Sequence, residues 1–447
     1  MLPASRIMLH RAYLRCSRLF ASVSAERPNE LSVSNALERF LVDKIRVTGP
    51  ITVAEYMKTA ISSSSVGYYG TQHKDGKQVF GESGDFITAP ELTQLFGEII
   101  GIWCYHELAN TGHKGPWNLI ECGPGTGTLA ADVLRVMKKF SENDVTLHLV
   151  ETSDALIDAQ EENLCGERTS NSCTQREGEN WVRTNRTKDA IAVYWYKNVD
   201  DLPDGFSVFI ANEFLDALPI HIFERESPSS TWHEKYIGLD GKGRLRFVRS
   251  PGENLHTKGL LPESIRSDNE RTTWEYSPEG GTFIHQVADR ISSHGGFALL
   301  IDYGHNGDRK ELSFRAYSKH EQVDPLSAPG EIDLTADVDF GHLRSLVQEN
   351  VLVYGPHTQR EFLGQMGVEV RLRRLLKECE NREQGEQLVK SYNMLMGDMG
   401  TRFLAMALFP KTIQSIIRRR GGAPSGFNGA PGAEKMKETS EKVEEVP

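Results

Sequence analysis

Residues 117–140 constrain the fold more than any other segment of the chain. The strand-like run Trp117–Cys122 leads directly into Gly123-Pro124-Gly125-Thr126-Gly127, and apolar residues at helical spacing follow: Leu129, Val133, Met137 and Phe140. Glycines permit positive φ angles and let a ligand approach the backbone, and the start of a helix offers unpaired N–H groups. The order of strand, glycine turn and helix therefore predicts a ligand site at the edge of a parallel α/β sheet.

The remaining apolar segments favour a doubly wound, mostly parallel sheet. From Trp117 onward, short apolar runs alternate with amphipathic helices, which is typical of a sheet covered on both faces. The predicted strands are 117–122, 146–151, 191–196, 206–211 and 296–303, with 351–354 and 402–409 closing the sheet. We expect the last of these to be an antiparallel edge strand, because Pro410 ends it.

The same pass along the chain predicts four regions. Residues 34–110 are predicted to form an N-terminal helical region with a Gly-rich loop that acts as a lid, and residues 115–226 and 281–410 to form the core. The polar segment 227–280 is predicted to be an insertion, a small antiparallel excursion beside the active site. Residues 421–447 are rich in Gly, Pro, Ser, Lys and Glu, which indicates a disordered tail.

The first 25 residues differ in composition from the rest. They contain Arg6, Arg11, Arg15 and Arg18, several serines and apolar residues, and the first acidic residue is Glu26. This composition is typical of a mitochondrial presequence, although a disordered basic N-terminus is the alternative. We therefore predict import into mitochondria, to the matrix.

Charge and cysteine usage exclude several classes of protein. The formal net charge of −11 disfavours nucleic acid as a partner, since binding to phosphate backbones rewards a basic surface. The six cysteines form no C-x-x-C pair and no histidine lies at metal-ligand spacing, so we predict no metal site and no disulfide framework. No apolar run reaches the roughly 18 residues of a spanning helix, so we predict no membrane insertion. Oligomeric state is not indicated.

Two carboxylates beside the glycine turn narrow the choice of cofactor. A dinucleotide fingerprint is G-x-G-x-x-G, but here the third glycine comes one residue early and Thr128 occupies its place. Glu121 ends the first strand, where it would repel a diphosphate and could attract the cationic amino group of a methionine moiety. Glu151 closes the second strand, where a carboxylate can accept both ribose hydroxyl hydrogen bonds. These features favour S-adenosyl-L-methionine, and we expect Glu121, Gly123, Gly125, Thr126, Gly127, Thr128 and Glu151 to bind it.

The end of the fourth predicted strand carries the candidate catalytic residues. Asn212, Glu213 and Asp216 follow that strand at the carboxyl edge of the sheet, where ligands of open α/β folds bind. The alternative is a helix N-terminus, with Asn212 as its cap and the two acids in its first turn.

Further acidic groups could approach the site from other segments. Asp85, Thr88, Pro90 and Glu91 are expected to fold over the methyl donor, with Gly81 and Gly84 as hinges and Asp85 among the catalytic residues. Asp302, at the end of the fifth strand, and the block Asp333, Asp337 and Asp339 could line the entrance. For Asp333 and Asp339 a solvated turn and a capped helix are the preferred interpretation.

Five segments together carry a resemblance to a known family. They are Gly84-Asp85-Phe86-Ile87-Thr88-Ala89-Pro90-Glu91, Glu121–Leu129 with the glycine turn, Asn212-Glu213-Phe214-Leu215-Asp216-Ala217-Leu218-Pro219, Leu300-Ile301-Asp302-Tyr303-Gly304 and Asp333–Phe340. In combination they resemble the MidA-like family of mitochondrial methyltransferases. The resemblance implies a class I (Rossmann-like) methyltransferase that symmetrically dimethylates an arginine of a matrix-arm subunit of respiratory complex I during assembly, a type II activity. Thr126 and Asn212 depart from the arginine and histidine that animal members can carry there.

Three alternative functions stay open at this point. The first is methylation of a small molecule, and the second is an assembly chaperone that uses S-adenosylmethionine only as a ligand. The third is an NAD-dependent oxidoreductase, which shares the strand, turn and helix.

Overall fold

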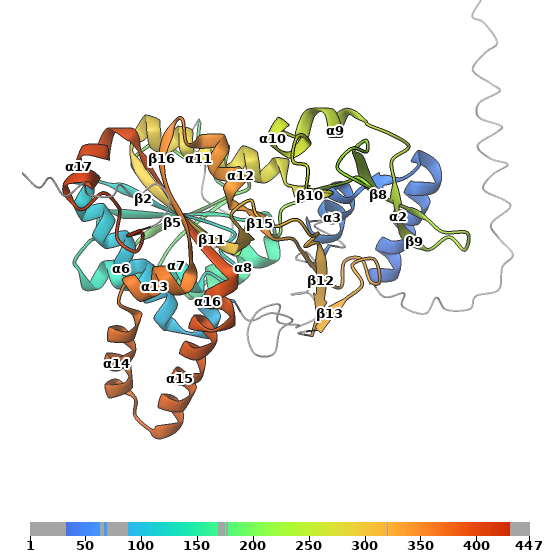
Figure 1. The fold of residues 1–447 in the computed structure, drawn as a ribbon. Helices are drawn as coiled ribbons and strands as arrows, with labels where there is room; N and C mark the ends of the chain where they lie inside the picture. Colours follow the sequence, from blue (N-terminus) through green and yellow to red (C-terminus); the bar gives the residue numbers. More distant parts are fainter. Residues whose placement is uncertain are drawn as a thin grey trace, which may run out of the picture.

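The computed structural model describes residues 33–62, 67–68, 88–168, 175, 178–319 and 321–429. Figure 1 shows a large lobe built around a twisted sheet and a smaller lobe beside it, with a helical hairpin projecting from the large lobe. The predicted presequence, the hinge glycines and Asp85 lie outside the described residues, and so does most of the predicted lid loop.

The sheet of the large lobe runs in the order β16-β17-β11-β6-β2-β3-β5-β4. Its parallel strands are β2 (Trp117–Cys122), β3 (Val145–Val150), β5 (Ala192–Tyr196), β6 (Ser207–Asn212) and β11 (Gly296–His305), and the short β15 (Val338–Asp339) also pairs with β11. The antiparallel strands are β4 (Arg183–Arg186), β16 (Val351–Thr358) and β17 (Phe403–Pro410). The predicted α/β fold with a mostly parallel sheet is confirmed.

The prediction that the last strand forms an edge is wrong. β17 is antiparallel, but it lies between β11 and β16 and pairs with both. Pro410 is its final residue, so every other residue of the strand keeps an N–H group for pairing. The edge strands of the sheet are β16 on this side and β4 on the other.

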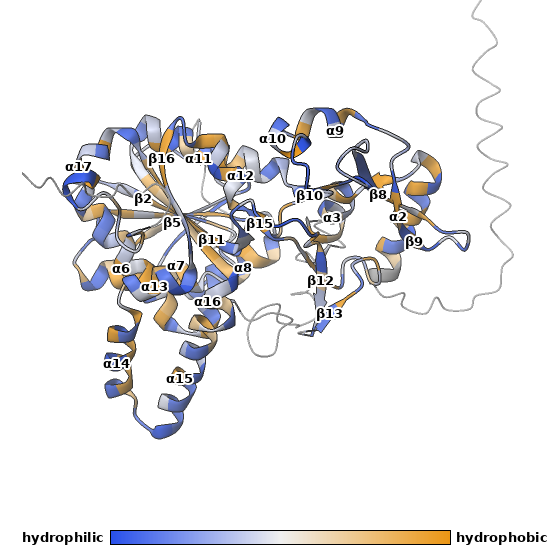
Figure 2. Cartoon of the chain, in the orientation of Figure 1, coloured by the Kyte–Doolittle hydropathy of each residue, from blue (hydrophilic) through white to orange (hydrophobic). Residues whose placement is uncertain are grey.

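Helices cover both faces of this sheet, as expected for a doubly wound fold. One face packs against α5 (Ala89–Leu92), α6 (Gln94–Thr111), α7 (Thr128–Lys139) and α8 (Asp154–Cys165). The other packs against α11 (Pro278–His294) and α12 (Phe340–Val347), while η1 (Val199–Asp201) lies near α11. Trp103 of α6 is fully buried and meets Phe297 of β11 edge-on, with ring centroids 5.4 Å apart. Figure 2 shows hydrophobic residues on the strands at the centre of the lobe.

The C-terminal helices complete the first of these faces. They are α13 (Gln359–Gln365), α14 (Val368–Glu378), α15 (Arg382–Met396) and α16 (Asp398–Arg402), followed after β17 by η2 (Lys411–Ile413) and α17 (Gln414–Arg419). Helices α14 and α15 form the projecting hairpin, and its tip is hydrophilic (Figure 2). Among the described residues, no helix combines the length and the apolar character that crossing a membrane requires.

The predicted disordered tail is wrong for residues 421–429. Phe427 is fully buried, with its ring 5.4 Å from that of Phe362. Glu107 of α6 accepts hydrogen bonds from Arg420 Nη1 (2.8 Å) and from the backbone N–H of Ser425 (2.9 Å). Phe427, Ser425 and the preceding Arg420 therefore hold this segment to the fold, although its overall composition is polar.

The smaller lobe is an antiparallel sheet with the N-terminal helices packed on it. The sheet order is β1-β8-β7-β10, with β9 paired to β8, and a second sheet runs β13-β12-β14. The elements are α2 (Val33–Thr48), β1 (Ile51–Thr52), α3 (Val53–Ser62), β7 (His221–Glu224), β8 (His233–Leu239), β9 (Leu245–Arg249), α9 (Leu255–Leu260), α10 (Glu263–Arg266), β10 (Thr273–Tyr276), β12 (Arg315–Ser318), β13 (Glu321–Val323) and β14 (Asp333–Thr335).

This lobe requires two changes to the predicted regions. Residues 34–110 do not form one unit, because α2 and α3 share a core with Ile222 and Ile237 of the inserted sheet, whereas α6 belongs to the large lobe. The insertion also begins before residue 227, since β7 pairs with β8 and β10. Both differences come from contacts between residues far apart in the chain, which local sequence patterns do not encode.

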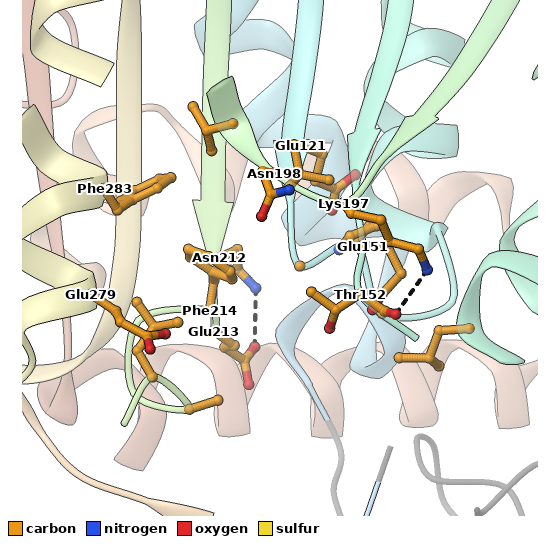
Figure 3. A pocket seen from close by; sticks show the side chains of 18 of the residues that line it. Glu121, Glu151, Thr152, Lys197, Asn198, Asn212, Glu213, Phe214, Glu279 and Phe283 are labelled. Carbon is orange, nitrogen blue, oxygen red and sulfur yellow. Dashed lines mark hydrogen bonds between the residues drawn. The ribbon is translucent and has the colours of Figure 1, made fainter. Parts of the chain in front are cut away.

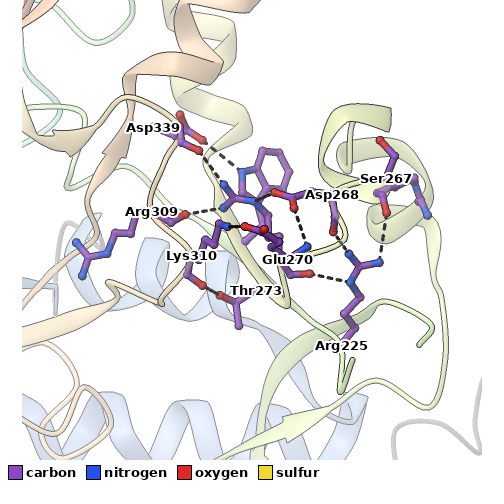
Figure 4. A network of polar contacts seen from close by, with 12 residues as sticks. Arg225, Ser267, Asp268, Glu270, Thr273, Arg309, Lys310 and Asp339 are labelled. Carbon is purple, nitrogen blue, oxygen red and sulfur yellow. Dashed lines mark hydrogen bonds and ion pairs between the residues drawn. The ribbon is translucent and has the colours of Figure 1, made fainter. Parts of the chain in front are cut away.

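A network of polar contacts joins the two lobes (Figure 4). Arg271, whose side chain is 4% exposed, donates to the carbonyl oxygens of Arg309 (2.6 Å) and Gly307 (2.7 Å), in the loop after β11. Thr273 donates to the carbonyl of Lys310, and Lys310 pairs with Glu270. These contacts, all partly buried, anchor the inserted sheet against the loop that follows β11.

Candidate active site

A cavity of about 580 Å³ opens at the carboxyl ends of β2, β3, β5 and β6. This volume suits a small ligand or cofactor, and the position is where open α/β sheets bind their ligands. Figure 3 shows side chains from these strand ends pointing into it, with Glu279 and Phe283 of α11 facing them.

The glycine turn forms one wall of the cavity, as predicted. Gly123 has φ 68°, and a Cβ atom there would lie 2.7 Å from the ring of Phe214. Both the positive φ angle and the lack of space for a Cβ atom therefore exclude larger residues at this position. Thr126 and Thr128 also line the cavity and share a hydrogen bond of 2.9 Å between their hydroxyl groups, and Thr126 Oγ1 donates to Glu91 Oε1 at 2.9 Å.

Gly127, predicted to bind the cofactor, is not among the residues that line the cavity. It is the N-cap residue of α7, with φ 81°. A Cβ atom there would lie 3.3 Å from the Leu164 side chain of α8. Its role in the structure is close packing between α7 and α8.

Glu121 lies at the cavity with one oxygen unpaired. The side chain is buried, and its Oε2 atom has no hydrogen-bond partner among the described residues. Burial, with a smaller contribution from nearby Asp132, raises the pKa of Glu121 to about 8. A cationic ligand group would donate a hydrogen bond to the unpaired oxygen. Its positive charge would also favour the charged carboxylate and so lower the pKa again.

Glu151 is held in place by the start of α8. Its Oε1 accepts from the backbone N–H of Ser153 (2.7 Å), and its Oε2 accepts from Gln160 Nε2 (3.3 Å). Burial raises the pKa of Glu151 to about 7 against these hydrogen bonds. Gln160 also donates to the carbonyl of Gly125 (2.8 Å), so it links the glycine turn to this carboxylate. The sequence analysis missed Gln160, since a lone glutamine on a helix carries no motif.

The residues after β5 were also missed. Lys197, Asn198, Val199, Asp200 and Asp201 line the cavity, and Lys197 Nζ donates to the carbonyl of Thr152 (2.8 Å) and to Asp154 Oδ1 (2.6 Å). Their position in the sequence could have identified them, because they follow a predicted strand that ends at the same sheet edge as Glu121 and Glu151.

The segment before α6 reaches the cavity through α5. Thr88, Pro90 and Glu91 line it, so the structure brings these predicted residues to the glycine turn. Glu91 Oε2 is buried without a partner among the described residues, and burial raises the pKa of Glu91.

Glu213 and Asn212 form the wall that faces the glycine turn. Glu213 is a non-glycine residue at φ 53°, in the left-handed region that bulky side chains rarely adopt. Its Oε1 accepts from the backbone N–H of Ala89 (2.9 Å) and from Asn212 Nδ2 (3.2 Å). Burial raises the pKa of Glu213 to about 8, and Asp216 adds to this increase. Asn212 Oδ1 is buried and unpaired among the described residues.

Asp216 and Asp302 lie behind this wall and do not line the cavity. Asp302 is fully buried, and its Oδ2 accepts from three consecutive backbone N–H groups, those of Phe214 (3.0 Å), Leu215 (2.8 Å) and Asp216 (3.2 Å). Asp216 Oδ2 accepts from Thr335 Oγ1 at 2.7 Å. Residues 213–218 therefore form a turn held by Asp302, and the alternative helix N-terminus is wrong.

The acidic block 333–339 does not line the cavity either. Asp339 caps α12 by accepting from the His342 N–H (2.8 Å), and Asp333 is buried in β14. Asp337 pairs with Arg309 and Arg315. The capped helix expected for Asp339 is thus observed, while the solvated turn expected at Asp333 is a buried strand.

Two helices far from each other in sequence close the cavity. Lys58 and Ile61 come from α3 of the small lobe, and Glu279, Phe283 and other residues come from α11 of the large lobe. Lys58 Nζ and Glu279 Oε1 form an ion pair of 2.8 Å across the lobes. The sequence analysis missed these residues, because nothing local links either helix to the site.

Comparison with known proteins assigns this architecture to a family. A family model described as "Putative S-adenosyl-L-methionine-dependent methyltransferase" matches residues 99–357. The chain is 60% identical to the mitochondrial protein arginine methyltransferase NDUFAF7 homolog of Caenorhabditis elegans, over 88% of this chain and 91% of that protein. The chain belongs to this methyltransferase family.

Other relatives agree with the assignment to the MidA-like methyltransferases. The mitochondrial protein arginine methyltransferase NDUFAF7 of Homo sapiens is 39% identical over 87% of this chain and 86% of that protein. A crystal structure from Burkholderia thailandensis, bound to S-adenosyl-homocysteine, superposes with a TM-score of 0.69 at 24% identity, covering 87% and 95% of the two chains. The predicted family resemblance is confirmed, and a mitochondrial location is supported by the names of these relatives.

The methyltransferase cavity fits S-adenosylmethionine, which confirms the predicted cofactor. Three buried oxygens on its wall, Glu91 Oε2, Glu121 Oε2 and Asn212 Oδ1, lack donors among the described residues. The cofactor carries an ammonium group, an adenine amino group and two ribose hydroxyls, all of which can donate. The same acidic lining would repel a diphosphate, so it disfavours the NAD alternative.

Proposed function

We propose that this protein transfers a methyl group from S-adenosylmethionine to a guanidinium nitrogen of a protein arginine. The two relatives described above are named protein arginine methyltransferases, which supports the same substrate here. We further propose symmetric dimethylation, a type II activity, on a subunit of the hydrophilic arm of complex I in the mitochondrial matrix.

The observation that carries this proposal is Glu213. It presents a half-buried carboxylate from a strained backbone position at the cavity, opposite the glycine turn. A strained backbone position persists only where the surrounding structure enforces it. Here the backbone N–H groups of the next three residues, 214–216, donate hydrogen bonds to Asp302 and hold the turn that begins at Glu213. A carboxylate held at the cavity in this way supports an arginine as the methyl acceptor.

A carboxylate at this position meets the particular difficulty of arginine as a nucleophile. The pKa of a guanidinium group lies far above neutral pH and the group stays protonated, so no ordinary base deprotonates it in advance. When bound, S-adenosylmethionine supplies an electrophilic methyl group on a sulfonium. Glu213 would hold the guanidinium by charge-assisted hydrogen bonds, orient one nitrogen toward the methyl donor and accept a proton as that nitrogen reacts.

The other residues have supporting roles in this proposal. Asn212 would donate to Glu213, as it does in the structure, and offer Oδ1 to the substrate or the cofactor. Asp216 would act through the turn rather than by contact, and a role for Asp85 stays a prediction. Glu121 and Glu151 would hold the amino and ribose groups of the cofactor.

The test uses purified full-length protein, S-adenosylmethionine with a labelled methyl group, and matrix extract from cells that lack the protein. We expect labelled symmetric dimethylarginine in acid hydrolysates of one protein band. Glu213→Gln should lower the rate by at least about 100-fold, as removal of a transition-state contact does, with cofactor affinity nearly unchanged by isothermal titration calorimetry. Glu361→Gln, which alters the cap of α13, is the matched control and should retain activity.

Each alternative gives a different result in this assay. Label in the low-molecular-weight fraction would favour a small-molecule substrate. Stable complex formation with no label in any protein would favour an assembly chaperone. Full activity of Glu213→Gln would show that the carboxylate mechanism is wrong.

A further inference from the structure

Three side chains of the small lobe meet although they lie far apart in the chain. His221 begins β7, and Glu234 lies in the neighbouring strand β8, opposite Phe223 and so diagonal to His221. His256 lies in the first turn of α9. One ligand atom from each lies within 4.8 Å of the others. The spacing of 13 and 22 residues matches no common metal motif, which is why the sequence predicts no metal site.

The geometry of this cluster is compact and converges on one carboxylate. His221 Nδ1 lies 2.6 Å from Glu234 Oε1, and His256 Nδ1 lies 2.9 Å from Glu234 Oε2. The two imidazole rings are 4.4 Å apart between centroids. Ligand atoms around a tetrahedral Zn²⁺ lie about 3.4 Å apart, given bond lengths of about 2.0–2.1 Å. Small side-chain rotations would therefore bring all three to an ion.

The surroundings of Glu234 resemble the outer shell of a metal ligand. Glu234 is fully buried, and its Oε2 accepts from Asn254 Nδ2 at 2.6 Å. Asn254 is itself fixed, because its Oδ1 caps α9 by accepting from the Thr257 N–H (2.8 Å) and its Nδ2 also donates to the hydroxyl of Tyr236 (2.7 Å). Such partners orient a ligating carboxylate and sharpen its geometry.

We propose that His221, Glu234 and His256 bind a Zn²⁺ ion that joins β7, β8 and α9. Two histidines and one glutamate are a known zinc ligand set, with the fourth position left to water, and imidazole favours zinc over the hard cations. His256 is 43% exposed and gives the ion a path from solvent, while His221 is 11% exposed.

The position of the site suggests what the ion does. His221 follows two residues after Pro219, which lines the methyltransferase cavity. An ion that holds β7 to β8 and α9 would stiffen the strand leading away from that wall. Its role would be structural, and methyl transfer does not depend on its chemistry.

The competing interpretation is a hydrogen-bonded cluster, in which both histidines donate Nδ1–H to Glu234 and no ion binds. The two interpretations differ in one measurable respect. In the hydrogen-bonded cluster the Glu234 carboxylate is already satisfied by its donors and Zn²⁺ gains nothing by entering, whereas a zinc site binds one ion per chain and releases protons.

The experiment uses the untagged full-length protein after dialysis against a chelator. We expect Zn²⁺ titration to show one tight site, with a rise in Tm of roughly 4 °C at saturating ion, as ligand linkage predicts for a large protein. Co²⁺ in place of Zn²⁺ should give visible d–d bands without the thiolate charge-transfer bands that binding at a cysteine would add. The Co²⁺ spectrum requires no variant and so does not depend on any variant folding.

Two variants decide between the interpretations. His256→Ala should weaken Zn²⁺ binding at least about 100-fold, since loss of outer-shell partners alone costs about 10–100-fold. His106→Ala is the matched control, because His106 is also half-exposed and lies 3.4 Å from a buried glutamate, Glu107, with no second histidine in contact among the described residues. No stoichiometric Zn²⁺ on the wild type, or equal binding by wild type and His256→Ala, would overturn the proposal.

Discussion

At the level of single residues, three carboxyl groups govern the chemistry of the cavity: the buried Glu121 and Glu151 and the half-buried Glu213. Burial raises the pKa of Glu121 to about 8, that of Glu151 to about 7 and that of Glu213 to about 8. Below these values each group is mostly protonated and neutral. The charge of the empty cavity therefore changes across the physiological pH range.

Affinity for the cofactor should rise with pH for this reason. Glu121 has a pKa of about 8, and only its charged form attracts an ammonium group. Below that pKa the charged fraction grows roughly tenfold for each pH unit, so we expect the affinity for S-adenosylmethionine to increase by at least about tenfold between pH ~6 and ~7.5. Isothermal titration calorimetry at several pH values measures it, and Glu121→Gln should bind more weakly and with a flatter pH dependence.

The stability of the ligand-free protein should change in the opposite direction. The pKa of Glu121 is 4.5 in the unfolded chain and about 8 in the fold, so the folded state binds more protons between these values. Its contribution to stability is complete below pH 4.5 and is lost as the pH rises through 8. Urea unfolding at pH ~6 and pH ~8 should show lower stability at the higher pH, and a rise would contradict the buried, neutral form.

Asp302 is a positioning residue whose effect should reach activity through Glu213. Asp302→Asn replaces one acceptor oxygen by an NH₂ group, so either the three N–H groups of residues 214–216 or the Tyr303 N–H (2.8 Å from Oδ1) lose a partner. We expect a loss of about 1–3 kcal/mol in stability and a fall in kcat with KM for the cofactor unchanged. Asp339→Asn, at the cap of α12, should leave kcat unchanged.

The C-terminal segment acts as a structural element of the large lobe. Phe427 fills a site against Phe362 and is fully buried, so Phe427→Ala should lower the free energy of unfolding by about 3–5 kcal/mol. Phe140→Ala, whose side chain is half-exposed, should cost less than about 1 kcal/mol. Denaturant unfolding compares the two, and equal values would show that residues 420–429 do not pack as described.

Elements with strong local patterns were predictable from the sequence. β2, the glycine turn and α7 lie where the pattern places them, because each is specified by adjacent residues. β7 was not assigned, since a four-residue strand has too little pattern to separate from a loop. The position of β17 inside the sheet depends on which strands it pairs with, and Pro410 alone gave the wrong answer.

The candidate site was also predictable only where local sequence patterns specify it. Residues at strand ends, such as Glu121, Glu151 and Glu213, could be identified because the carboxyl edge of a parallel sheet is one place in space. Lys58 and Glu279 could not, since they reach the cavity only when two lobes come together.

At the scale of the whole molecule, the site requires both lobes to be joined. Arg271→Ala removes two charge-assisted hydrogen bonds to partly buried carbonyl groups of the loop after β11 and should cost about 2–4 kcal/mol. Cofactor affinity should stay within about threefold, because the residues that hold it belong to the large lobe, whereas transfer to protein should fall about tenfold or more. Arg249→Ala, at a half-exposed ion pair in the same lobe, should change neither quantity.

The place of β17 in the chain also determines when the large lobe can be completed. The strand lies between β11 and β16, yet it begins at Phe403, after both of them have been synthesised. Until it arrives, two apolar strands present unpaired edges, which are templates for aggregation. A product that stops short of residue 403 would therefore be an aggregation hazard rather than a smaller enzyme, and nascent chains would need protection until their last strand emerges.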